Sequence, residues 1–121
     1  MMNTINPGFM EKKIILETND SHLIIRISEI IRIEEGGKGS VLFLSNNKKM
    51  EAAEDLDFWA TKLIKHPFIM VHDSHLLNLN AIESYDLQDK PSVTLSNGEH
   101  IEVQDKYKIM LKEVFNDYLE K

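Results

Sequence analysis

Short apolar runs alternate with turn-forming residues along most of this chain, and this pattern predicts a protein rich in strands. Asn97-Gly98 favours a hairpin turn because both residues readily adopt a positive φ. Residues 31–34 alternate between apolar and charged side chains, which predicts a half-buried strand, whereas residues 76–80 look irregular. Eight or nine short strands are therefore expected, and the runs that carry them lie at 14–17, 22–27, 30–34, 40–45, 50–53, 68–72, 81–87, 92–95 and 100–103.

Two segments change to the period of a helix. In residues 54–65 apolar side chains recur at the i, i+3, i+4 and i+7 positions, and Pro67 prevents the helix from continuing. From Tyr107 to Leu119 a continuous apolar stripe predicts a helix that Gln104 or Asp105 can cap. The expected fold class is mostly β, with one short middle helix and a C-terminal helix.

The length and the terminal residues indicate the domain organisation. With 121 residues the chain has the size of one domain with a single core. Residues 1–10 show no hydrophobic period and are expected to form a flexible tail, so that the single domain would span residues 11–121. Neither a signal peptide, nor a membrane-spanning run, nor a cysteine occurs in the sequence. A cytoplasmic protein is expected.

The net charge changes the functional expectation. There are 14 basic and 20 acidic residues, which gives a formal net charge of −6. Proteins that bind DNA draw much of their affinity from lysine and arginine side chains on phosphates. Taken alone, the charge argues against nucleic acid, so a DNA-binding face would have to be a local exception.

His72, Asp73, Ser74 and His75 form the densest polar cluster of the sequence. Consecutive residues of a strand point to alternating sides, so they do not form a Ser–His–Asp relay, and no enzyme is expected. A zinc site needs three or four converging ligands at definite spacing, and the sequence contains no such motif, so no metal or other cofactor is expected. Two interpretations stay open: the loop recognises a partner, or His72 only satisfies hydrogen bonds of its own loop.

Residues 68–85 resemble the signature of the LytTR domain family. The pattern is Phe-x-Arg-hydrophobic-His-Arg-Ser-aromatic-hydrophobic-Val-Asn-x-x-x-Ile, and eight positions fit it: Phe68, Val71, His72, Ser74, Leu76, Leu77, Asn78 and Ile82. Residues 27–35 are similar to a further strand of the family, 54–63 to its short helix and 92–108 to its closing hairpin. The resemblance covers about residues 13–111.

This resemblance implies an elongated fold of antiparallel sheets that places loops in successive major grooves of DNA. The members are bacterial transcription regulators, often response regulators, so double-stranded DNA is the expected partner. The DNA-facing residues that the resemblance implies are Lys38, Ser40, Met70, His72, Asp73, Ser74, Gln104, Asp105 and Lys106. Asn78 is expected to fix the local backbone instead.

Four of these positions depart from the family pattern. Met70 and Asp73 stand where the family usually has arginine, and Gln104 and Asp105 stand where it has Ser-Arg. A carboxylate beside a phosphate repels it where a guanidinium would attract it. A second hypothesis is therefore kept: a LytTR-like protein-interaction module, acting as an antagonist or a dimerisation partner, in which DNA binding is weakened or lost. The apolar C-terminal helix could provide a homodimer face.

Overall fold

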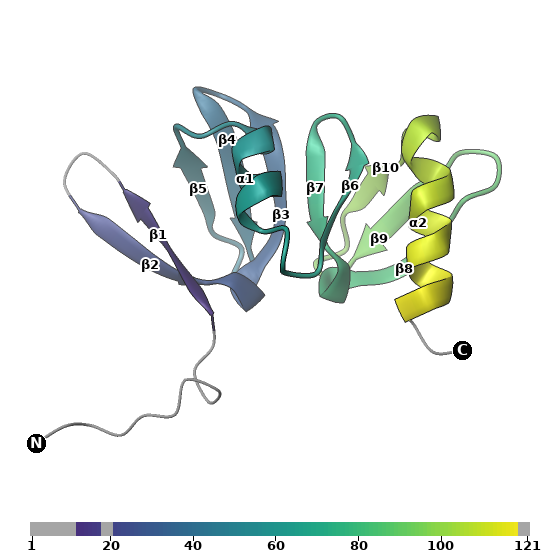
Figure 1. The fold of residues 1–121 in the computed structure, drawn as a ribbon, viewed down its shortest axis with the longest axis horizontal. Coiled ribbons are helices and arrows are strands. Elements are labelled where there is room, and N and C mark those ends of the chain that lie inside the picture. Colours follow the sequence, from purple (N-terminus) through teal and green to yellow (C-terminus); the bar gives the residue numbers. More distant parts are fainter. Residues whose placement is uncertain (1–11, 18–20, 119–121) are drawn as a thin grey trace, which may run out of the picture.

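Three antiparallel sheets lie in a row along the long axis of the molecule in the computed structural model (Figure 1). The structure describes residues 12–17 and 21–118, so the expected tail at residues 1–10 lies outside the described residues. The strands are β1 (Lys13–Glu17), β2 (His22–Arg26), β3 (Ile30–Gly36), β4 (Gly39–Leu44), β5 (Lys49–Ala52), β6 (Phe68–His72), β7 (His75–Asn78), β8 (Ile82–Asp86), β9 (Ser92–Leu95) and β10 (His100–Glu102). The helices are α1 (Leu56–Lys62) and α2 (Asp105–Tyr118), with the short 3-10 turns η2 (Ile27–Glu29) and η3 (Leu79–Ala81).

The central sheet holds the molecule together. Its strand order is β5-β4-β3-β7-β6, with the β1–β2 hairpin on one side and the β10-β9-β8 sheet on the other. The predicted antiparallel, mostly β fold with two helices is confirmed. No helix in the described part of the chain has the length and apolar character needed to span a bilayer.

Two hydrophobic clusters, rather than the single core expected from the length, lie in the described residues. The first packs α1 and the β1–β2 hairpin around Ile33, Leu42 and Trp59. The second packs α2 and the three-stranded sheet around Val71 and Leu77. The central sheet carries residues of both clusters, because alternate side chains of a strand point to opposite faces. One sheet therefore serves two cores.

The burial of both faces of the central sheet explains why the predictions for residues 31–34 and 76–80 were wrong. Ile30, Ile31, Arg32 and Ile33 of β3 are all buried, so the strand expected to be half-buried is a central one. Residues 76–80 looked irregular because both Leu76 and Leu77 are apolar, but residues 76–78 belong to β7 and residues 79–80 to η3. Leu76 packs in the first hydrophobic cluster and Leu77 in the second, so both faces of β7 are buried. A strand buried on both sides loses the alternation that identifies it in sequence.

The hairpin turn between β3 and β4 is held close to the segment that follows β5. A Cβ atom on Gly39 would lie 2.4 Å from the carbonyl oxygen of Ala53, so this position has room only for glycine. The next residue, Ser40, is 1% exposed, and its hydroxyl accepts a hydrogen bond from Trp59 Nε1 at 2.9 Å while donating to the Glu54 carbonyl oxygen at 2.7 Å. These contacts fix the turn over the start of α1.

Candidate nucleic-acid interface

Three loops that are far apart in the sequence meet at one end of the strands. The loops are the β3–β4 turn (residues 36–39), the β6–β7 turn (residues 73–74) and the start of α2 (residues 104–106). All three lie at the top of Figure 1, and together we call them the upper edge. The Glu35 amide donates to the Ser74 carbonyl oxygen at 3.0 Å, which joins the first two loops. The Gln104 amide donates to the Val71 carbonyl oxygen at 2.9 Å, which joins the second to the third. These bonds bring the three loops together on one edge of the strands.

The β6–β7 turn is fastened to α2 by side chains as well. The Asp73 amide donates to Gln104 Oε1 at 2.8 Å. The Asp73 carboxylate in turn accepts a hydrogen bond from the Tyr107 hydroxyl at 2.8 Å and contacts Lys106 Nζ at 2.6 Å. The turn therefore cannot shift relative to the start of the helix without breaking several polar contacts.

These contacts change the charge balance of the edge. The hydrogen bond from Lys106, together with that from Tyr107, holds the pKa of Asp73 below its ordinary value, and Asp73 raises the pKa of Lys106. The Asp73 charge is thus directed at an ammonium group rather than presented alone to the solvent. Asp105 and Lys38 are both exposed. The four charged side chains of the predicted set have a net charge of zero. The carboxylates of Asp73 and Asp105 therefore do not give the edge a net negative charge that would repel a duplex.

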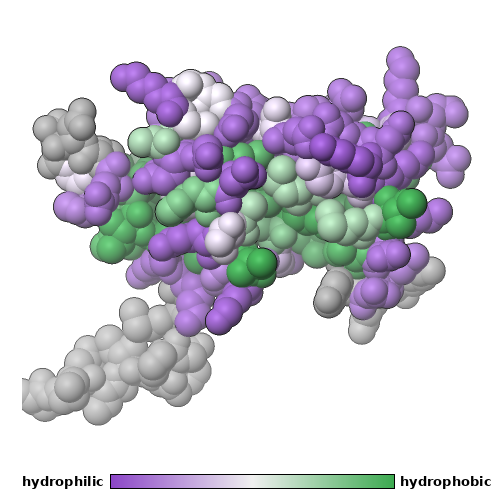
Figure 2. Space-filling model, turned by 45° about the horizontal axis from the view of Figure 1, so that its top comes forward, coloured by the Kyte–Doolittle hydropathy of each residue, from purple (hydrophilic) through white to green (hydrophobic). Residues whose placement is uncertain are grey.

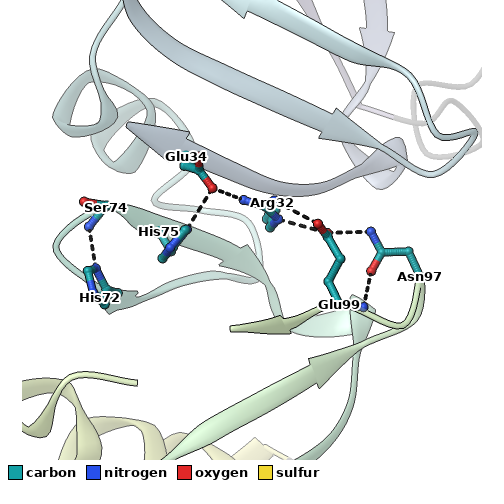
Figure 3. Close-up of polar contacts among 7 residues, drawn as sticks. All are labelled: Arg32, Glu34, His72, Ser74, His75, Asn97 and Glu99. Atoms are coloured by element: carbon teal, nitrogen blue, oxygen red, sulfur yellow. Dashed lines mark hydrogen bonds and ion pairs between the residues drawn. The ribbon is translucent and has the colours of Figure 1, made fainter. Parts of the chain in front are cut away.

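His72 uses one ring nitrogen within its own loop, and Figure 3 shows the contact. Its Nδ1 accepts a hydrogen bond from the Ser74 amide at 3.0 Å, so Nε2 carries the proton of the neutral ring and remains the donor. The half-buried ring therefore serves the loop with one nitrogen and has a second for another contact. Asp73 points at Lys106 rather than at His72, so the three consecutive residues do not form a catalytic relay. No group of three or more potential metal ligands occurs in the part of the chain that the structure describes.

Two residues of the predicted set do not belong to the exposed edge. Ser40 is a core residue whose hydroxyl is used by Trp59 and by the backbone, because β4 turns its side chain inward under α1. Met70 is half-buried and packs against the first hydrophobic cluster. Position along a strand decides both cases, since an odd or even offset selects the face. Asn78 fixes backbone as expected, donating to the Ile30 carbonyl oxygen at 2.9 Å and accepting from the Asn80 amide at 2.9 Å.

A buried charge network lies behind the edge and was missed in the sequence (Figure 3). Arg32 donates two hydrogen bonds to the Glu99 carboxylate, at 3.0 and 2.9 Å, and one to Glu34 at 2.6 Å. Its guanidinium lies 3.6 Å from the centre of the Phe43 ring. Burial lowers the pKa of Arg32, but the bonds to both carboxylates outweigh burial and raise it overall. The network ties β3 to the turn between β9 and β10; an arginine inside an isoleucine-rich run was its signal in the sequence.

His75 lies between this network and the β6–β7 turn. Its Nδ1 is buried, has no hydrogen-bond partner and lies 3.6 Å from Glu34 Oε1. Burial lowers the pKa of His75 in spite of the nearby Glu34. The neutral ring is therefore the form that the structure favours, and the contact with Glu34 is too long for a good hydrogen bond.

The sequence model of the LytTr DNA-binding domain matches residues 20–116, a range that includes all three loops of the upper edge. The chain belongs to the LytTR family of DNA-binding domains. A solved structure, the LytTr DNA-binding domain of a Bacillus cereus protein described as a methyl-accepting/DNA response regulator, matches with a TM-score of 0.74 and 19% identity. The match covers 88% of this chain and 98% of that one, and at this identity the likeness concerns the fold. No curated protein matches the sequence.

This assignment gives the upper edge its context. LytTR domains form a family of DNA-binding domains rather than of enzymes, and the matched range contains His72, Asp73 and Ser74 together with Gln104, Asp105 and Lys106. Tyr107 is an addition to that set which sequence reasoning missed, because it was counted with the apolar stripe of α2. Its hydroxyl donates a hydrogen bond to Asp73, and residue spacing alone does not reveal this contact.

Proposed function

We propose that this LytTR domain is a sequence-specific DNA-binding transcriptional regulator that inserts the loops of its upper edge into the major groove. The observation that carries the proposal is the convergence of the three loops on one edge within a range that the family model matches. A loop edge of this kind presents several short polar side chains side by side, which is what readout of base edges requires.

The residues divide into two roles. Lys38 at the β3–β4 turn and Lys106 at the start of α2 are exposed and neutralise phosphates on either side of the groove. His72 Nε2, the Ser74 hydroxyl and the Gln104 amide donate to or accept from base edges. Phosphate contacts position the domain, and the polar contacts between them select the sequence.

The acidic residues fit this proposal through their partners. Asp73 orients Lys106 and the β6–β7 turn, so its carboxylate acts by positioning, and it also accepts a bond from a cytosine amino group where the groove brings one close. Asp105 lies in the first turn of α2, where a negative charge stabilises the helix. With few unpaired cations at the edge, binding is expected to be weaker and less dependent on salt than in a strongly basic domain.

Selection of duplexes from a randomised library, followed by affinity measurements over a salt series, tests the proposal. A selected duplex should bind more weakly as salt rises, and Lys38→Ala should reduce the slope of log affinity against log salt by about one. Lys106→Ala should also weaken binding. Lys65→Ala is the matched control, because Lys65 is exposed in the segment between α1 and β6, at the opposite end of the strands, and should leave binding unchanged.

The absence of any selected duplex at low salt would remove the proposal. In that case co-purification of a regulator protein would support the alternative, a LytTR-like interaction module that antagonises or pairs with a partner. The two readouts are independent, so one preparation of the protein decides between them.

A further inference from the structure

The β1–β2 hairpin carries an open strand edge with unusual self-complementarity. Within the described residues these two strands pair only with each other, in the register Lys13 to Arg26, Ile15 to Ile24 and Glu17 to His22. The pairing continues without a bulge, and neither strand contains proline. Bulges and prolines are two of the devices that protect an edge from another strand, and neither occurs in these two strands.

The hydrogen-bond pattern identifies which residues of β1 face the open edge. Pairs in an antiparallel ladder alternate between those that exchange backbone hydrogen bonds and those that do not. The Ile27 amide donates to the Lys12 carbonyl oxygen at 2.9 Å, which extends the same register by one pair and sets the alternation. The amide and carbonyl groups of Lys13, Ile15 and Glu17 therefore point away from β2.

The outer face of the same hairpin is apolar at its centre. Ile15 is 61% exposed and its cross-strand neighbour Ile24 is 68% exposed, whereas Ile14 and Leu16 of the opposite face are buried in the first hydrophobic cluster. Hydrophobic surface, coloured green in Figure 2, is visible on the left, where the hairpin lies. Two exposed isoleucines in register extend the edge into a small apolar surface.

We propose that β1 pairs with β1 of a second copy of this chain, in an antiparallel dimer whose two-fold axis passes through Ile15. This register sets Lys13 of each copy opposite Glu17 of the other, with the two Ile15 side chains between the ion pairs. All three residues have their backbone groups on the open edge, so the ladder they form is complete. The interface is isologous and closes after two copies.

Charge decides between the two outer edges of the hairpin. The equivalent pairing of β2 with itself would set His22 opposite Arg26, which brings no anion to a cation. On β1 each end residue meets its opposite charge, and opposite-charge pairs across strands are favourable whereas like charges are not. The second copy therefore docks on β1, and the result is a continuous four-stranded sheet in the order β2-β1-β1-β2.

Sedimentation equilibrium of the whole chain, at concentrations up to about 1 mM, tests this dimer. The chain should show a reversible monomer–dimer equilibrium. Lys13→Glu or Glu17→Lys alone should raise the dissociation constant about tenfold, because each change opposes like charges twice across the two-fold axis. The double variant Lys13→Glu with Glu17→Lys should recover the original dissociation constant. Lys12→Glu is the matched control and should have no effect, since its carbonyl oxygen accepts from the Ile27 amide and position 18 opposite it is uncharged.

Ile15→Pro gives an independent readout. Its missing amide hydrogen lies on the open edge, so the hairpin of the monomer stays intact, as circular dichroism should show, while the dimer is lost. A chain that is monomeric at every concentration overturns the proposal. A dimer that is indifferent to both single charge changes also overturns it, because such a dimer uses another surface.

Discussion

Replacing Arg32 tests whether the buried charge network supports the domain. Arg32→Met keeps an unbranched side chain of similar length but removes the guanidinium, and with it the bidentate contact to Glu99, the bond to Glu34 and the stacking on Phe43. Arg32 is only 5% exposed, so water cannot substitute for it without opening the structure. We expect the variant to fold with clearly reduced stability.

The magnitude follows from the exposure of the partners. Hydrogen bonds to charged groups contribute about 1.5–3 kcal/mol each. The side chains of Glu34 and Glu99 are 38% and 36% exposed, so water partly satisfies the carboxylates left behind and each bond is discounted to about 1 kcal/mol. Three bonds and the ring contact, less the burial that Met restores, give a loss of about 2–4 kcal/mol in the free energy of unfolding.

Urea and thermal denaturation measure this loss. For a domain of this size the expected decrease in Tm is about 8–16 °C. Arg26→Met is the matched control, because the side chain of Arg26 is 51% exposed and its ion pair with Glu29 should contribute less than about 1 kcal/mol. If both variants lose the same small amount, the desolvation of Arg32 cancels its bonds and the reasoning is refuted. A measured coupling above about 1 kcal/mol between Arg32→Met and Glu99→Gln would assign the loss to this pair.

Three further predictions concern single contacts. Ser40→Ala should destabilise the domain by about 1–3 kcal/mol and alter the fluorescence of Trp59, the sole tryptophan, because its buried Nε1 loses its acceptor. Gly39→Ala should lower Tm by several degrees, since the new Cβ meets the Ala53 carbonyl oxygen; an unchanged Tm in a thermal scan would contradict this steric argument. The arginine hydrogen bond lowers the pKa of Glu99, so the unfolded chain binds more protons near pH 4 and stability should fall as pH decreases from about 5 to 3. Glu99→Gln should flatten this pH dependence in urea titrations, and an unchanged slope would contradict it.

Much of the fold could be predicted from the sequence because local patterns carry it. Turn residues such as Asn97-Gly98 and the i, i+3, i+4 period around Trp59 depend on backbone preference and on one apolar face, and both act over a few residues. The signature at residues 68–85 also indicated the family and, with it, an antiparallel fold. Asn78 is an example of a role that local chemistry suffices to predict, since one of its two bonds stays within two residues.

Tertiary structure decided the residues whose environment comes from another part of the chain. β7 and the buried part of β3 became central strands only because sheets and helices cover both of their faces, and this covering removes the alternation that marks a strand. Ser40 lies in the core because Trp59, nineteen residues away, uses its hydroxyl. The same holds for Asp73, whose negative charge departs from the family pattern and forms an ion pair with Lys106 in the folded chain.

The sequence by itself thus determines which charged residues are present and most of the local elements. These charged residues include the acidic ones at the loops and the arginine within the isoleucine run. What those charges do depends largely on partners that are distant in the sequence, such as the Tyr107 hydroxyl, 34 positions from Asp73, and Glu99, 67 positions from Arg32. Electrostatic energy depends on the distance between two charges and on their burial, and both are set by the tertiary structure rather than by adjacent residues in the sequence.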